Sequence, residues 1–263
     1  MINTKVGPLV SVVLSVYNDS LFLKKTINCI LNQSYKNLEL IIIDDGSNKN
    51  TKLILAEFSM SNKKVRIIKN QYNLGLTKSL NIGIKKAKGK YIARHDSDDF
   101  SFKLRIEKQV NFLEKNRNIV MCGTQRIIEN KIQNRTYRDY LPTKLTDIRK
   151  SALYKNPFFH SSVMIRKKIL FHVGFYNEKY KYIQDLELWS RVIYKYQCEN
   201  LPDILCKKYI DNKRISFNKK LLFIRSYYSL KARYRIYLNG HHNLLNFVKM
   251  IFIFFGFIKY NET

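Results

Sequence analysis

The sequence predicts an α/β domain with a mostly parallel, doubly wound sheet that carries helices on both faces. Short apolar runs alternate with stretches of helical spacing through the first part of the chain. Polar residues follow the apolar runs, where parallel strands would end together along one edge of a sheet. With 263 residues, 45% of them hydrophobic, the chain is long enough to bury one substantial core.

Four apolar runs predict strands, at Val10–Val16, Leu38–Ile43, Val65–Ile68 and Tyr91–Ala93. Helical spacing predicts helices between them, at Leu21–Leu31, around Leu53–Phe58 and at Gly75–Ala87. Ser47 is suited to cap the second of these helices, because its hydroxyl can accept a hydrogen bond from the first turn. Strands that alternate with helices in this way build parallel sheets covered on both faces.

Beyond the fourth predicted strand the pattern is less regular. Apolar spacing predicts a helix at Lys103–Lys115, whereas the basic stretch Arg126–Lys150 indicates irregular structure. Residues 156–165 are expected to form a loop that leads into a strand. Gln184 is expected to open a helix that reaches Ile193.

The chain is strongly basic, with 48 Lys and Arg against 20 Asp and Glu and a formal net charge of +28. Such a charge is typical of proteins that bind nucleic acid or an anionic membrane. Lys, Asn, Ile and Tyr are frequent throughout, however, as an AT-rich genome would produce without selection for binding. The charge therefore carries less weight, and because the strand ends are acidic we expect no nucleic-acid partner. The four cysteines form no C-x-x-C pair, and their simplest interpretation is reduced thiols in the cytoplasm.

Three acids stand within four residues, at Asp96, Asp98 and Asp99, shortly after the strand Tyr91–Ala93. Carboxylates that crowd together repel one another, and a bound cation relieves that repulsion. Mg²⁺ and Mn²⁺ prefer oxygen ligands and commonly bridge one or two carboxylates to substrate phosphates. The segment alone is equally compatible with a metal–diphosphate site and with an acidic turn that caps the next helix.

Polar signals follow each of the four predicted strands, at residues 17–19, 44–45, 70–73 and 96–99. Ligands of parallel α/β sheets bind at the carboxyl ends of the strands. The convergence of four polar strand ends on one edge therefore predicts a ligand site there.

Five blocks of the chain resemble the motifs of family-2 glycosyltransferases, in the order and at the spacing of that family. They are Pro8–Asn18, Leu38–Ser47, Asn73–Gly83, Gly89–Asp99 with the D-x-D acids, and Gln184–Trp189. Together they cover roughly residues 8 to 195. No single block is specific to this family, but five blocks in the family's order are strong evidence for the resemblance.

The resemblance implies a GT-A fold over residues 1–212, with a nucleotide-sugar-binding half at about 8–100 and an acceptor half at about 101–212. It implies metal-dependent transfer, with Mn²⁺ or Mg²⁺, of a sugar from a nucleotide-sugar donor with inversion at the anomeric carbon. A uridine donor is the family's commonest case. The expected acceptor is a glycan or a lipid-linked hydroxyl in the synthesis of a surface polysaccharide or lipopolysaccharide.

Carried over position by position, the resemblance implies six residues that contact the donor nucleotide: Tyr17, Asn18, Asp45, Lys78, Arg94 and Asp96. Tyr17, Asn18 and Asp45 would line the nucleoside pocket, and Asp96 would approach the ribose. Arg94 and Lys78 would neighbour the diphosphate, although each alone reads as a surface charge.

By the same resemblance, Asp98 would hold the metal. Asp99 would assist it or cap the following helix, and we favour the cap. Asp44 is expected to be structural at its strand end.

Asp185 aligns with the family's catalytic acidic position and is expected to be the general base that takes the proton of the acceptor hydroxyl. The alternative is that Asp185 caps the helix that follows it. Gln184, where Glu is more usual, would orient Asp185 or an acceptor hydroxyl. His160 resembles a family position near the active site, but a histidine beside aromatic residues is equally often structural. Trp189 is either a sugar platform or, the interpretation we favour, part of the core.

Residues 213–263 form a basic and aromatic tail that ends in the apolar run 247–255. A basic helix followed by an aromatic one suits the interface of an anionic membrane. We expect a cytoplasmic enzyme whose tail contacts the inner face of the cell membrane. The alternative is a helical cap over the catalytic core.

Two other classes of protein are considered beside an active glycosyltransferase. One is a catalytically inactive, glycosyltransferase-like scaffold, which the intact acids at Asp96, Asp98 and Asp185 disfavour. The other is a basic, nucleic-acid-binding α/β protein, which the acidic strand ends disfavour. A nucleotidyltransferase would need a glycine-rich loop after the first strand, where Tyr17–Ser20 stands instead.

Overall fold

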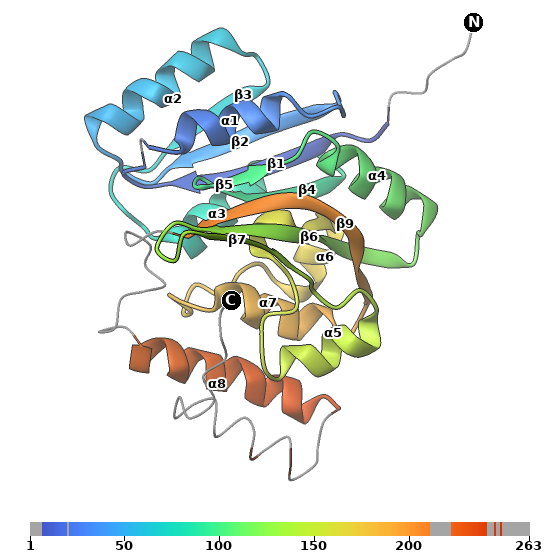
Figure 1. The fold of residues 1–263 in the computed structure, drawn as a ribbon. Coiled ribbons are helices and arrows are strands. Elements are labelled where there is room, and N and C mark those ends of the chain that lie inside the picture. The colour runs from blue at the N-terminus through green and yellow to red at the C-terminus, as the bar shows by residue number, and fades with distance from the viewer. Residues whose placement is uncertain (1–6, 20, 211–221, 241–244, 246–247, 249–263) are drawn as a thin grey trace, which may run out of the picture.

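A nine-stranded sheet runs through the molecule in the order β3-β2-β1-β4-β8-β6-β9-β5, with β7 paired to β6 (Figure 1). The structure is a computed structural model that describes residues 7–19, 21–210, 222–240, 245 and 248. The first four strands are parallel: β1 (Val10–Val16), β2 (Leu38–Asp44), β3 (Val65–Lys69) and β4 (Tyr91–Asp96). They confirm the four predicted strands, and β4 continues three residues beyond its predicted end.

Beyond β4 the sheet becomes mixed. The remaining strands are β5 (Asp99–Ser101), β6 (Ile119–Asn130), β7 (Arg135–Asp139), β8 (Met164–Arg166) and β9 (Gln197–Ile210). Strand β8 is antiparallel to β4 and to β6, whereas β9 is parallel to β6 and antiparallel to β5. The parallel arrangement predicted for the sheet thus holds from β3 to β4, within an α/β fold that is otherwise as predicted.

Helices cover both faces of the sheet, because the buried strands are apolar on both faces. Helices α1 (Leu23–Leu31), α2 (Lys49–Ser61) and α4 (Arg105–Lys115) pack on one face with Val12 and Leu14. The other face, which includes Val13, carries α3 (Leu76–Lys86), α5 (Leu145–Ala152), α6 (Lys167–Val173), α7 (Gln184–Val192) and α8 (Leu222–Leu238). A short 3-10 helix, η1 (His160–Ser162), precedes β8.

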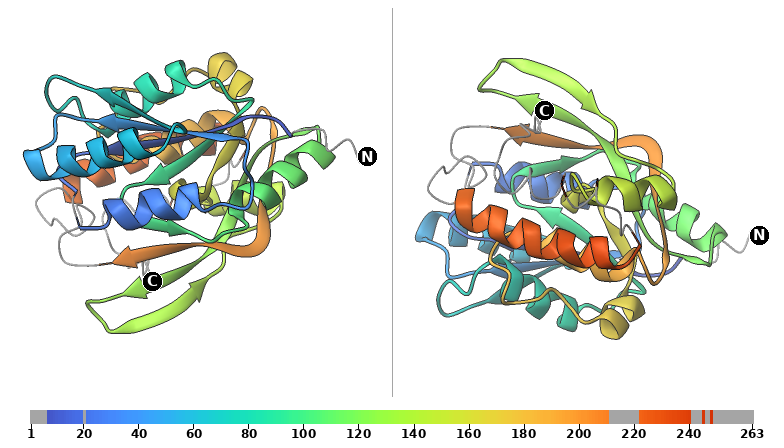
Figure 2. Two further views of the ribbon diagram at one scale, coloured as in Figure 1. Left: turned by 90° about the horizontal axis from the view of Figure 1, so that it is seen from above. Right: turned by 90° about the horizontal axis from the view of Figure 1, so that it is seen from below.

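Two local predictions were wrong. The stretch Arg126–Lys150 is not irregular, because it contains the end of β6, all of β7 and most of α5. The β6–β7 hairpin projects from the body of the sheet (Figure 2), so its polar side chains face solvent and lack the apolar signal of a buried strand. Helix α2 is capped not by Ser47 but by Asn48, whose side chain accepts a hydrogen bond of 3.1 Å from the Thr51 N–H.

Helix α8 lies against α5 and α7 on the outer side of the molecule (Figure 1). Ala232 and Ile236 are buried in the core on this side of the sheet. Arg233 donates a hydrogen bond of 2.8 Å to the carbonyl of Ala152. In the described part of the chain, no helix is long and apolar enough to cross a membrane. Except for Val248, the apolar run 247–255 lies outside the described residues.

Two leucines of helix α2 provide a matched test of this packing. Leu55 is 2% exposed in the core, whereas Leu53 is 59% exposed. We expect Leu55→Ala to lower the free energy of unfolding by about 2–5 kcal/mol, because it leaves a cavity. Leu53→Ala should change it by about 0.5 kcal/mol or less. Urea denaturation of both variants measures the difference, and equal losses would contradict the placement of α2.

Candidate active site

The carboxyl ends of β1, β2 and β4 lie side by side, because Val16 pairs with Asp44 and Ser15 pairs with Asp96. The predicted convergence of polar strand ends is therefore present. Asp96 and Asp99 flank the two-residue turn between β4 and β5, and Asp98 is part of the turn. Asp98 is half-buried in the turn, and Asp99 is buried as the first residue of β5.

Asp99 does not cap the following helix, so that favoured interpretation was wrong. The N-cap position of α4 is Leu104, five residues further on. The Asp99 carboxylate instead accepts a hydrogen bond from the hydroxyl of Ser161.

Asp96 is paired with a buried cation. Its Oδ1 atom lies 2.5 Å from Nη2 of Arg94, whose side chain is almost completely buried. Burial is the largest single effect and would raise the pKa of Asp96, but the charge and hydrogen bond of Arg94, together with the hydrogen bond from Ser161, hold this pKa well below its usual range. Asp96 is consequently an anion at neutral pH.

Ser161 joins two of the acids, and sequence analysis did not identify it. Its hydroxyl lies 2.7 Å from Asp96 Oδ2 and also contacts Asp99 Oδ2. It accepts a hydrogen bond of 3.1 Å from the Asp96 backbone N–H. The contact depends on the pairing of β4 with β8, and nothing local in the sequence around Ser161 signals it.

Asp45 holds the loop between β3 and α3. Its Oδ1 accepts hydrogen bonds of 2.8 Å from Asn70 Nδ2 and from the Leu74 N–H, and its Oδ2 accepts one of 2.9 Å from the Gly75 N–H. Gly75 has φ +86°, a conformation that glycine adopts without strain. The neighbouring Asp44 accepts a hydrogen bond of 2.9 Å from the Ser47 N–H and so shapes the end of β2.

Three further predicted residues lie near the surface. Tyr17 is 51% exposed at the end of β1. Asn18 has φ +53°, and its side chain accepts a hydrogen bond of 2.8 Å from the Asn48 N–H at the start of α2. Lys78 is exposed in the first turn of α3, and no hydrogen bond or ion pair joins it to the described acids.

Asp185 is the second residue of α7, so the alternative that it caps this helix is wrong. The N-cap position belongs to Ile183, whose apolar side chain makes no capping hydrogen bond. Ile183 has φ +58°, an outlier for a β-branched residue. Backbone strain of this kind persists where the surrounding structure enforces it, often at functional sites.

The Asp185 carboxylate is oriented by hydrogen bonds. Asn156 donates to Oδ2 through Nδ2, and the Leu186 N–H donates to Oδ1 at 2.8 Å. Burial raises the pKa of Asp185, and these hydrogen bonds together with the Arg94 charge offset the rise only in part. Asn156, rather than the buried Gln184, orients Asp185 in this structure.

His160, Tyr176 and Trp189 form an aromatic cluster beside these acids. His160 Nε2 and Tyr176 Oη are 2.7 Å apart. The His160 and Trp189 rings are arranged edge to face, with their centroids 6.1 Å apart. Burial lowers the pKa of His160 well below its ordinary value, so its ring is neutral at neutral pH. Trp189 is 1% exposed and belongs to the core.

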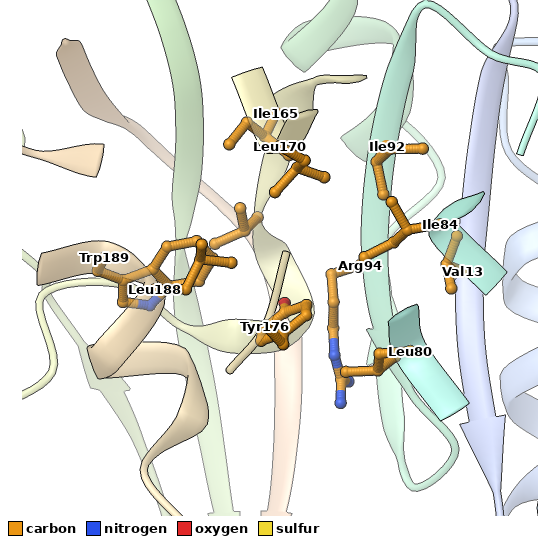
Figure 3. Close-up of a pocket in the computed structure, with 11 residues that line it drawn as sticks. Val13, Leu80, Ile84, Ile92, Arg94, Ile165, Leu170, Tyr176, Leu188 and Trp189 are labelled. Carbon is orange, nitrogen blue, oxygen red and sulfur yellow. The ribbon is translucent and has the colours of Figure 1, made fainter. Parts of the chain in front are cut away.

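Arg94 and Trp189 also line a small cavity with Tyr176, Leu80 and Leu188 (Figure 3). Arg94 extends from β4 alongside Leu80 and Tyr176, whereas Trp189 lies on the opposite wall. The cavity volume is about 10 Å³, room for about one water molecule. Among the described residues, no hydrogen-bond acceptor contacts Arg94 Nε or Nη1.

Comparison with known proteins identifies the family. The model of "Glycosyl transferase family 2" matches residues 11–183, well over half of the chain. The chain belongs to glycosyl transferase family 2. The match contains the acidic turn and the Asp45 loop, and it ends two residues before Asp185.

Two similar proteins are also described as glycosyltransferases. An uncharacterized glycosyltransferase of Haemophilus influenzae is 37% identical over 76% of this chain and 65% of its own length. Another, from Methanocaldococcus jannaschii, is 34% identical over 87% of this chain and 80% of its own length. The chain thus spans slightly under two thirds of the first relative.

Solved structures show that the fold is GT-A. S. aureus TarS 1–349 superposes with a TM-score of 0.73 over 96% of this chain and 73% of the 1–349 chain, at 16% identity. The mannosyltransferase PcManGT of Pyrobaculum calidifontis has a TM-score of 0.68 over 94% of this chain and 73% of its own, at 13% identity. At these identities the likeness concerns the fold alone.

In the family-2 fold, Arg94 acts on two of the predicted acids, Asp96 and Asp185. Its charge lowers the pKa of Asp96 and also acts to lower that of Asp185. Among the described residues, no three His, Cys, Asp or Glu side chains are arranged to hold a metal ion by themselves.

The Asn156 contact generates a prediction. Because a hydrogen bond to the charged form of a carboxylate lowers its pKa, we expect Asn156→Ala to raise the pKa of Asp185 further. A ¹³C-carboxyl NMR titration, assigned with Asp185→Asn, measures the shift. Asn116→Ala is the control, because that side chain donates to the Phe112 carbonyl at the end of α4. An unchanged or lower pKa in Asn156→Ala would contradict the assigned contact.

Proposed function

We propose that this glycosyltransferase moves a sugar from a nucleoside-diphosphate donor, uridine-linked in the first instance, to a hydroxyl group with inversion at the anomeric carbon. The observation that carries the proposal is the acidic turn at the strand ends, with the Asp185 carboxylate near the same buried Arg94. Support for the donor class comes from structures of S. aureus TarS in complex with UDP and with UDP-GlcNAc. PcManGT was solved with GDP-Man and Mn²⁺.

The residues at the turn fit a divalent cation, Mn²⁺ or Mg²⁺. Asp98, half-buried in the turn, would hold it, as its place in the D-x-D block implies. Asp96 is engaged by Arg94 and Ser161. When bound, the cation would neutralise negative charge that develops on the departing diphosphate. The donor phosphates would complete its ligand set.

Arg94 is the second source of positive charge for the diphosphate. It is buried, and its Nε and Nη1 atoms meet no acceptor among the described residues. A buried N–H group without a partner is unfavourable, so a phosphate oxygen or a water molecule is the expected acceptor. Lys78, exposed in the first turn of α3, would contribute charge from the rim.

The nucleoside would lie at the ends of β1 and β2. Tyr17 offers an exposed ring, and Asn18 offers a side chain that is bonded to the start of α2. Asp45 would shape this pocket through the loop that it holds, because both of its oxygens already accept hydrogen bonds there. Asp96 would approach the ribose.

Asp185 would act as the general base for the acceptor hydroxyl. Its pKa is raised by burial, which makes the carboxylate a stronger base. Asn156 would keep it oriented, while neutral His160 and buried Gln184 would stand near the acceptor. Trp189 would support this wall from the core rather than stack on a sugar, because it is only 1% exposed.

The acceptor would be a glycan or a lipid-linked hydroxyl in surface polysaccharide or lipopolysaccharide synthesis. The observation that favours a membrane-bound acceptor is the outer face of α8, which we define as Ile224, Tyr227, Lys231, Tyr234 and Leu238. These exposed residues recur at helical spacing, and residues 222–240 contain no acid. Aromatic and basic residues on one helix face suit the surface of an anionic membrane.

Hydrolysis of nucleotide sugars tests the reaction class without a known acceptor. We expect one donor of a panel to be hydrolysed slowly with Mn²⁺ and to be protected by chelation. Asp185→Asn should lower the rate by about 10²-fold or more, since a positioned acid or base commonly contributes about 10²–10⁴-fold. Asp98→Ala should also lower the rate strongly, because it removes the carboxylate that would hold the cation.

Asp203→Asn is the matched control for the charge change, because Asp203 pairs with Lys108 at the surface. It should retain the wild-type rate. Hydrolysis that survives chelation or both substitutions would refute the assigned roles. If no donor is hydrolysed and no nucleotide binds in Mn²⁺, an inactive scaffold becomes the better interpretation.

Vesicle binding tests the outer face of α8. Full-length protein should sediment with phosphatidylglycerol vesicles at 0.15 M salt, and Lys231→Glu should reduce the partition coefficient by about tenfold or more. Each basic residue near an anionic surface contributes about 1 kcal/mol, and the reversal changes two charges.

Lys52→Glu makes the same change of net charge on the exposed side of α2, across the sheet from α8 (Figure 1). It should leave most of the binding intact. Equal losses in Lys52→Glu and Lys231→Glu, or a wild type that does not sediment, would count against docking through α8.

A further inference from the structure

The turn that presents Asp98 is held from outside the sheet by one hydroxyl group of helix α1. Thr26 Oγ1 lies 2.7 Å from the carbonyl oxygen of Ser97 and 2.9 Å from that of Asp99. Thr26 is 1% exposed, so water does not compete for these contacts. The two carbonyls belong to the residues on either side of Asp98.

The sheet itself does not fix this part of the backbone. Asp96 still pairs with Ser15 of β1, and Asp99 pairs with Lys208 of β9. Ser97 and Asp98, between these two ladders, form the turn. Ser161 binds the side chains of Asp96 and Asp99, whereas Thr26 binds the main chain around Asp98.

The hydroxyl of Thr26 carries one proton that both carbonyl oxygens share. The contact therefore fixes the separation of the two carbonyls and the direction in which the Asp98 side chain leaves the turn. Mg²⁺ and Mn²⁺ sites tolerate little error in ligand position, and catalytic groups generally need placement within about 0.5 Å. A donor that fixes the backbone on both sides of a metal ligand thus acts directly on metal affinity.

We propose that Thr26 is a positioning residue for the metal-binding carboxylate of Asp98. The inference rests on the proposed role of Asp98, and it adds a residue of α1 that lies far from the D-x-D block in sequence. Thr26 touches neither the donor nor the cation in this account. It acts through the turn.

Helix α2 offers a matched control. Thr51 is also completely buried on the first turns of its helix, but its Oγ1 has no hydrogen-bond partner among the described residues. Thr26→Val and Thr51→Val therefore make the same chemical change in buried helices of the same face. Only Thr26→Val removes a contact with the turn.

The experiment measures Mn²⁺ binding by electron paramagnetic resonance in the presence of UDP or GDP, whichever binds the wild type better. We expect Thr26→Val to weaken Mn²⁺ binding by about 10-fold or more, the range seen when residues that orient a metal ligand are lost. Thr26→Ser retains the hydroxyl and should remain within about threefold of the wild type. Nucleotide binding without metal should be the same in all variants, and thermal unfolding checks that each variant folds.

The outcomes separate this inference from the function on which it rests. Unchanged Mn²⁺ affinity in Thr26→Val, or an equal loss in Thr51→Val, would overturn the positioning role alone. Failure of Thr26→Ser to restore affinity would overturn it as well. A wild type whose nucleotide binding is insensitive to Mn²⁺ would overturn the proposed metal site together with this inference.

Discussion

The crowding of three carboxylates at the end of β4 is the constraint on which the rest of the site depends. Like charges in a partly buried turn are unfavourable unless neighbouring groups compensate them. Arg94 supplies the charge, Ser161 supplies a hydroxyl between two of the acids, and Thr26 fixes the main chain. These groups come from β4, η1 and α1, so the turn is held by elements that are far apart in the sequence. The transition from parallel to mixed sheet begins at this strand, where β8 brings Ser161 to the acids.

Arg94 also affects the pKa values of the Asp96 and Asp185 carboxylates to different extents. It lowers the pKa of Asp96, which pairs with it directly, well below the usual range. At Asp185 the same charge acts more weakly than burial, and the pKa is raised. Burial acts to raise both pKa values, and the two acids differ because only Asp96 forms an ion pair with Arg94 and a hydrogen bond with Ser161. The first suits a permanently charged binding group, and the second suits a base.

The sequence predicted the first four strands and their polar ends well, because buried parallel strands carry continuous apolar runs. It failed at the β6–β7 hairpin, where exposed strands have polar side chains, and at β9, a long strand that mixes Lys with Cys and Leu. Ser161, Asn156 and Thr26 were missed for another reason. Each contacts one of the acids or the acidic turn, and the two partners lie 29 to 73 residues apart in the sequence. Ser, Asn and Thr are too common for the local sequence to indicate such contacts.

Helix α8 is joined by an ion pair to α7, the helix that carries Asp185. Glu187, buried at 1% exposure two residues after Asp185, lies 2.9 Å from Arg191 and 2.8 Å from Arg235 of α8. Arg191 also donates hydrogen bonds of 2.7 Å to the carbonyls of Gly174 and Phe175, just before Tyr176. A buried acid that loses a partner is strongly destabilising, so these arginines tie α8, α7 and the segment before α7 into one unit. The inner face of α8 is thereby fixed to the helix of Asp185, and a surface bound by its outer face would be held at a set orientation to that carboxylate.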